Sequence, residues 1–211
     1  SYGNPPVVRL FTHWKGDIDV DLSLALFDDG FSMLEQVSYT NLRSDGYGIV
    51  HSGDVQNAPR GASEFIDFSP ERLLAQGVRY AVAHVISFRG DGFNTFPCFA
   101  GYMERDRLKS GQKYEPQSVA LKFDVTSRAT EHLPLIFDLR AGEAIFADIA
   151  GGKGRHRNIL SQEPVVAQTA RAVLDMPRTR PTVHDVAMLH ARARGNVVDG
   201  REEADTLFDR D

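Results

Sequence analysis

The chain has 211 residues, a formal net charge of -5 and 42% hydrophobic side chains, which is an ordinary composition for a globular protein. The negative charge disfavours nonspecific binding to nucleic acid or to anionic membranes. No apolar run approaches the ~20 residues that a membrane-spanning helix needs, so the sequence predicts no transmembrane segment.

A single cysteine, Cys98, excludes an internal disulfide framework and fits a reducing compartment. It follows Pro97 in an aromatic run, which predicts a buried, unreactive thiol. Because no signal-peptide pattern opens the sequence either, we expect a cytoplasmic protein.

Short segments of strand character are separated by turns rich in Gly and Asp along the first three quarters of the chain. Many short strands with little helix between them are typical of an all-β protein, and we predict a β-sandwich of two antiparallel sheets. One segment, 64–68, alternates apolar and charged residues, as an outward-facing strand should. The predicted strands cover residues 7–11, 17–27, 33–39, 48–51, 64–68, 78–88, 93–103, 118–123, 133–139 and 144–149.

The longer helical patterns begin after Gly152, where the composition changes. Residues 163–174 carry apolar side chains at helical spacing, and a second helix opens at Thr182 with Asp185 completing a capping box. We therefore predict a β-sandwich domain over residues 1–155 and a helical C-terminal extension over residues 156–211.

An acidic alternation stands in the second predicted strand, where Asp17, Asp19 and Asp21 would share one face. Neighbours on one face of a strand lie ~6.6 Å apart, so three carboxylates would repel each other and their pKa values would rise. A hard cation such as Ca²⁺ is one remedy, because it prefers several oxygen ligands. A solvated face of an edge strand explains the pattern equally well, and spacing alone leaves both interpretations open.

Three motifs along the chain are similar to those of one known family. The motifs are Asp-Val-Asp-Leu-Ser-Leu-Ala-Leu-Phe at 19–27, Tyr-Thr-Asn at 39–41, and Asp-Gly followed by Ile-Val-His-Ser-Gly-Asp within 45–54. On these residues the chain resembles the TerD family of tellurite-resistance and stress-response proteins, over residues 7–153.

The resemblance implies a β-sandwich that binds Ca²⁺ through loop carboxylates and carbonyls, without catalysis. Carried over by position, it implicates Asp19, Asp21, Asn41 and Asp54. The family's acidic loop is replaced here by residues 55–64, in which only Glu64 keeps a matching acid. Adding Asp17 from the strand face and Asp91 from a later loop, the predicted metal ligands are Asp17, Asp19, Asp21, Asn41, Asp54, Glu64 and Asp91.

The leading functional expectation is a non-enzymatic, Ca²⁺-binding module in bacterial tellurite-resistance or stress-response machinery, with protein partners. No nucleophile or general base with an orienting partner is apparent in the sequence, so we do not expect an enzyme. The sequence leaves a homo-oligomer open. The alternative is a metal-independent interaction domain that has lost the calcium site, and the altered loop at 55–63, which brings in Arg60, favours it.

Overall fold

The computed structural model describes residues 5–56, 58–106, 116–152, 159–176, 182–196, 198 and 201–203. Its strands are β1 Val7–Trp14, β2 Val20–Phe27, β3 Met33–Val37, β4 Arg43–Ser44, β5 Ile49–His51, β6 Ala62–Phe68, β7 Tyr80–Ser87, β8 Cys98–Arg105, β9 Val119–Asp124, β10 Glu131–Asp138 and β11 Glu143–Gly151. The helices are α1 Pro70–Ala75, α2 Glu163–Asp175 and α3 Val183–Arg194. No described helix is both long enough and apolar enough to cross a membrane.

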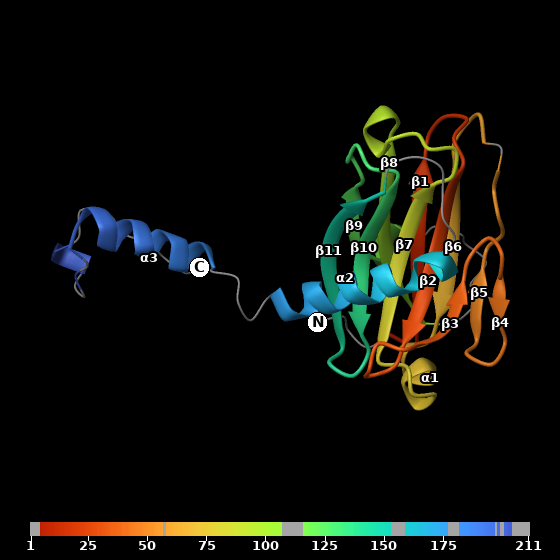
Figure 1. The fold of residues 1–211 in the computed structure, drawn as a ribbon, viewed down its shortest axis with the longest axis horizontal. Helices are drawn as coiled ribbons and strands as arrows, with labels where there is room; N and C mark the ends of the chain where they lie inside the picture. Colours follow the sequence, from red (N-terminus) through yellow and green to blue (C-terminus); the bar gives the residue numbers. More distant parts are fainter. Residues whose placement is uncertain are drawn as a thin grey trace. The chain divides into compact units, whose positions relative to one another are not determined.

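The strands form two stacked antiparallel sheets (Figure 1). The six-stranded sheet has the order β4-β5-β6-β1-β8-β9, and the five-stranded sheet has the order β11-β10-β7-β2-β3. Side chains alternate between the two faces of each strand, so Leu22, Leu24 and Leu26 of β2 lie in the core between the sheets. The predicted β-sandwich is confirmed.

The acidic strand starts later than predicted. β2 begins at Val20, and Asp17 and Asp19 lie in the connection that precedes it. Gly16 has a φ of +105°, so the chain turns there instead of running straight into the strand. The expected row of three aspartates on one strand face is therefore wrong, because only Asp21 lies in β2.

Trp14, at the end of β1, fixes this connection. Its buried indole donates a hydrogen bond from Nε1 to the carbonyl oxygen of Ile18 at 2.6 Å. Gly61 packs against the backbone at the end of β1 and has a φ of +83°. A Cβ at this position would come within 2.3 Å of the Trp14 carbonyl oxygen. The close backbone approach at Gly61 and the indole hydrogen bond together set where Asp19 enters the fold.

β6 is an inner strand, between β5 and β1, and its position corrects the outward-facing strand predicted over residues 64–68. Glu64 points between the sheets and is completely buried. Asp67 lies on the opposite face, where it accepts two hydrogen bonds of 2.6 Å from Arg9 of β1. Both charged side chains of β6 are therefore buried, and each of them is hydrogen bonded.

A β-bulge interrupts the pairing of β10 with the edge strand β11. Leu133 pairs with Ile149 and Leu135 pairs with Phe146, so Pro134 faces two residues of β11. One of these two is Asp148, whose φ is +50°. Proline has no N–H to donate and is therefore tolerated at such a bulge within a sheet.

The chain divides into two compact units, residues 1–171 and 172–211, with the division inside α2. The predicted boundary between residues 155 and 156 lies outside the described residues. The part of α2 that belongs to the first unit, residues 163–171, crosses the outer face of the five-stranded sheet (Figure 1), and Val166 and Ala170 are buried. Arg171 donates a hydrogen bond to the carbonyl oxygen of Gly30 at 3.1 Å.

The second unit contains α3, whose ends follow the predicted signals. Thr182 and Asp185 form the capping box, and the helix ends at Gly195.

In the first unit, Cys98 is buried as predicted, and burial raises the pKa of its thiol to about 12.

Candidate metal centre

Three carboxylates from separate segments meet beside the start of β2. Asp19 precedes β2, Asp21 is its second residue, and Asp54 follows β5 in the six-stranded sheet. One carboxylate oxygen from each lies within 4.8 Å of the others. Asp21 is only 2% exposed, so this acidic cluster of Asp19, Asp21 and Asp54 lies largely out of water.

The cluster lies beside an open stretch of sheet edge. β3 pairs with β2 only from Leu24 to Phe27, and beyond Val37 the chain turns away to β4 in the other sheet. Within the described part of the chain, this leaves Leu22 without a paired strand on that side. An unsatisfied backbone group in the interior costs about 1–3 kcal/mol, so both polar groups of Leu22 need other partners.

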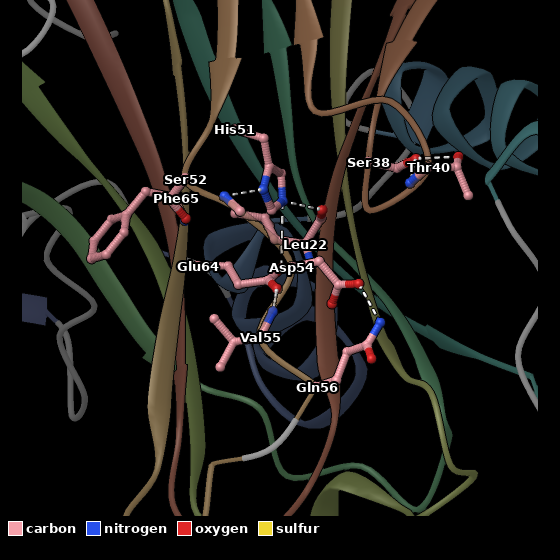
Figure 2. A network of polar contacts seen from close by, with 11 residues as sticks. Leu22, Ser38, Thr40, His51, Ser52, Asp54, Val55, Gln56, Glu64 and Phe65 are labelled. Carbon is pink, nitrogen blue, oxygen red and sulfur yellow. Dashed lines mark hydrogen bonds and ion pairs between the residues drawn. The ribbon is translucent and has the colours of Figure 1, made fainter.

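Two side chains from the six-stranded sheet supply these partners (Figure 2). Glu64 accepts a hydrogen bond from the Leu22 N–H at 2.8 Å, and the Nε2 of His51 lies 3.0 Å from the Leu22 carbonyl oxygen. The Gly53 N–H donates to Nδ1 of His51 at 3.1 Å, so the ring proton is on Nε2, which donates to Leu22. The other oxygen of Glu64 accepts from the Val55 N–H at 3.0 Å.

Burial and mutual repulsion dominate the electrostatics of the cluster. Burial, and then the negative charges of Glu64, Asp19 and Asp54, raise the pKa of Asp21 from 3.8 to about 8. Burial, followed by the charges of Asp21 and Asp54, also raises the pKa of Tyr39. These carboxylates are therefore too close together for all of them to ionise at neutral pH without a cation.

A second set of contacts holds the loop that carries Asp54. Gln56 donates from Nε2 to Oδ2 of Asp54 at 2.6 Å (Figure 2), and Arg89 donates to the Gln56 carbonyl oxygen at 2.9 Å. Arg89 follows β7, so the loop is attached to both sheets. Among the described residues, Oδ2 of Asp21 and Oδ1 of Asp54 are buried and have no hydrogen-bond partner.

The structure brings some of the predicted ligands together and leaves others apart. Asp19, Asp21 and Asp54 converge, and Glu64 lies beside them with its two oxygens on backbone N–H groups. Of the remaining three, Asp17 is exposed, Asn41 donates from Nδ2 to the Gln36 carbonyl oxygen at 2.7 Å, and Asp91 lies outside the converging group.

Three further residues of the site, His51, Tyr39 and Gln56, were not predicted to have a role. His51 and Tyr39 lie within the family-like motifs, and their positions in those motifs could have indicated that they belong to the site. Gln56 belongs to the altered loop, and nothing in its local sequence indicates that its amide binds Asp54.

Comparisons with known proteins find likeness in structure and not in sequence. No protein-family model and no curated protein sequence matches the chain. A crystallised protein of unknown function, SAV2460, aligns with a TM-score of 0.57 and 16% identity, covering 78% of this chain and 98% of that one. A homologue of the telluride resistance protein TerD from Streptomyces coelicolor aligns with a TM-score of 0.52 and 13% identity, covering 75% of this chain and 95% of that one.

The chain has the fold of a TerD homologue. At this level of identity the likeness identifies the fold alone, and the TerD-like sandwich is the fold that the sequence motifs implied. Because the alignment covers 95% of the Streptomyces protein, the rest of this chain is additional to the TerD-like part.

Proposed function

We propose that this protein is a non-enzymatic, Ca²⁺-binding domain that acts as a binding or scaffold module. The observation that carries the proposal is the convergence of Asp19, Asp21 and Asp54, whose carboxylate oxygens lie within 4.8 Å of one another. Its role in bacterial tellurite-resistance or stress-response machinery, with protein partners in the cytoplasm, rests on the resemblance of the sequence motifs.

The residues present fit a hard divalent cation. Carboxylate oxygens are the ligands that Ca²⁺ prefers, and Ca²⁺ tolerates irregular arrangements of them. Within the described part of the chain, Asp21 and Asp54 each have a buried oxygen without a hydrogen-bond partner. A bound cation would satisfy these oxygens and would also remove the repulsion that raises the pKa of Asp21. Asp19, Asp21 and Asp54 would hold the ion.

Calorimetric titration of the EDTA-treated protein with Ca²⁺ at pH 8 tests the proposal. We expect heat of binding, and a rise in melting temperature corresponding to about 2.7 kcal/mol when free Ca²⁺ is 100 times Kd. Asp54→Asn should weaken binding, whereas Asp45→Asn, at an exposed site, should leave it unchanged. No heat and no rise in melting temperature at millimolar Ca²⁺ would reject the proposal.

A metal-independent interaction domain is the second candidate, and one contact favours it. The Gln56 amide already donates to Asp54 at 2.6 Å, and a proton on Asp21 would relieve much of the remaining repulsion. The acids could then coexist without an ion. Asp19→Asn separates the two candidates. If it changes stability only in the presence of Ca²⁺, the calcium proposal gains support, and a change that is the same with and without Ca²⁺ favours the interaction domain.

A further inference from the structure

We propose that His51, acting together with Glu64, is a positioning residue that fixes Asp21 and Asp54 relative to each other and thereby sets the cation affinity of the acidic cluster. We name this pair of side chains, bound to Leu22, the cross-sheet clamp. The inference rests on the proposed calcium function and extends it to a residue that does not itself contact the ion.

The clamp replaces strand pairing that β3 does not provide, because β3 pairs with only the second half of β2. β3 pairs with β2 from Leu24 onward, so among the described residues no strand pairs with the stretch of β2 that includes Asp21 on that side. In its place, His51 and Glu64 reach across from the facing sheet and bind both backbone groups of Leu22. The side chains of His51 and Glu64 are fully buried, which leaves water no access to compete for these bonds.

The side chains of His51 and Glu64 also bind the backbone on either side of Asp54 (Figure 2). The residue before it, Gly53, donates its N–H to His51, and the residue after it, Val55, donates its N–H to Glu64. Each clamp residue therefore holds one flank of Asp54, and both hold Leu22.

Two of the three carboxylates that would bind an ion, Asp21 and Asp54, are thus joined through one hydrogen-bonded network. Asp21 directly precedes Leu22, so the clamp holds the peptide next to one ligand and the peptides on both sides of the other. Partners that hydrogen bond directly to metal ligands commonly contribute about 10–100-fold to metal affinity. The clamp binds the peptides next to the ligands, so we expect an effect at the lower end of this range. His51 is the informative member of the clamp, because Nδ1 accepts a hydrogen bond and the ring carries one proton on Nε2, so replacing it leaves the charge of the site unchanged.

Two substitutions each remove half of the function of His51. His51→Gln keeps an N–H donor for the Leu22 carbonyl and removes the acceptor for Gly53. His51→Asn keeps an acceptor near the position of Nδ1 and removes the donor to Leu22. We expect each variant to fold and to bind Ca²⁺ about tenfold more weakly than the wild type in calorimetry. In EDTA, amide exchange at Gly53 should be about tenfold faster in His51→Gln than in His51→Asn.

Two further variants separate positioning from charge and from general stability. Glu64→Gln removes a charge and cannot accept from two N–H groups as a carboxylate does, so we expect a larger loss of Ca²⁺ affinity than for either His51 variant. Asp67→Asn is the matched control. It lies on the same strand, removes the same charge and breaks the ion pair with Arg9, but its side chain lies on the opposite face of the sheet. It should lower the melting temperature and leave Ca²⁺ affinity within about twofold of the wild type.

The outcomes distinguish the two proposals. If the wild type gives no heat with Ca²⁺, the calcium function is overturned and the positioning role falls with it. If the wild type binds and both His51 variants bind equally tightly, the calcium function stands and the positioning role is overturned. If Asp67→Asn weakens binding as much as Glu64→Gln does, the effect arises from charge or stability, and the clamp is again rejected.

Discussion

Asp21 is a carboxyl group in surroundings that favour its neutral form. It is 2% exposed and lies near three other acids, and burial is the main cause of its raised pKa. The sequence could identify Asp21 as a candidate ligand from its alternation with Asp19. The family-like motifs also implicated Asp54 and Glu64. That both residues come from the facing sheet could not be predicted from strand periodicity, because it depends on tertiary contacts between distant segments.

The raised pKa predicts how the stability of the metal-free protein depends on pH. The pKa of Asp21 is about 8 in the folded protein, whereas the ordinary value of 3.8 applies to the unfolded chain. Between these two pH values the native state holds a proton that the unfolded state has released. The stabilisation from this proton is complete below about pH 4 and is lost as the pH rises towards 8. In EDTA, the melting temperature should therefore fall less between pH 5 and 8 in Asp21→Asn than in the wild type. An equally steep fall in the variant would contradict the shift.

Ca²⁺ should stabilise the protein more strongly as the pH rises, because a carboxylate must lose its proton before it binds a metal. The gain in melting temperature on adding Ca²⁺ is therefore expected to be greater at pH 8 than at pH 6.

At the scale of elements, local patterns predicted most of the strands and helices. Period-two alternation indicated β7, helical spacing indicated α2, and the Thr182 and Asp185 pair marked the start of α3. The predicted start of β2 was wrong. The turn at Gly16 and the Trp14 hydrogen bond determine where the strand begins, and neither of them follows from strand periodicity. The burial of Glu64 was also missed, because a charged residue in an alternating strand is normally solvated.

The entry into β2 depends on Gly61, which gives a test at this scale. Gly61→Ala would place a methyl group 2.3 Å from the Trp14 carbonyl oxygen in addition to straining a backbone with φ +83°. Gly77 has almost the same φ, +84°, but a Cβ added there would have no neighbouring atom of the described residues within 4 Å, so Gly77→Ala measures the backbone strain alone. We expect a loss of about 1–2 kcal/mol for Gly77→Ala and a clearly larger loss for Gly61→Ala in urea denaturation. Equal losses would mean that the contact with Trp14 is unimportant.

At the scale of the whole molecule, the early part of α2 belongs to the sandwich unit. The compact unit extends to residue 171, and Arg171 lies with its guanidinium 5.0 Å from the centre of the Phe31 ring. The sequence predicted that a helix would follow the strands but not which face it would cover, because an amphipathic pattern identifies a buried stripe and not its partner.

A pair of adjacent valines in α2 tests this packing. Val166 is 1% exposed, and Val165 is 59% exposed. Val166→Ala should lower the free energy of unfolding of the sandwich by about 1–3 kcal/mol, whereas Val165→Ala should change it by less than about 0.5 kcal/mol. Urea denaturation followed by Trp14 fluorescence reports on the sandwich directly. Equal effects would show that this part of α2 is not packed on it.

The bulge between β10 and β11 affects how copies of this protein can meet. β11 is an edge strand, and a long regular edge can template pairing with another chain. At Asp148 the backbone departs from the extended conformation, with φ +50°, so a straight strand laid along β11 would lose register there. The irregular residue opposite Pro134 thus discourages fibril-like growth from this side of the sandwich.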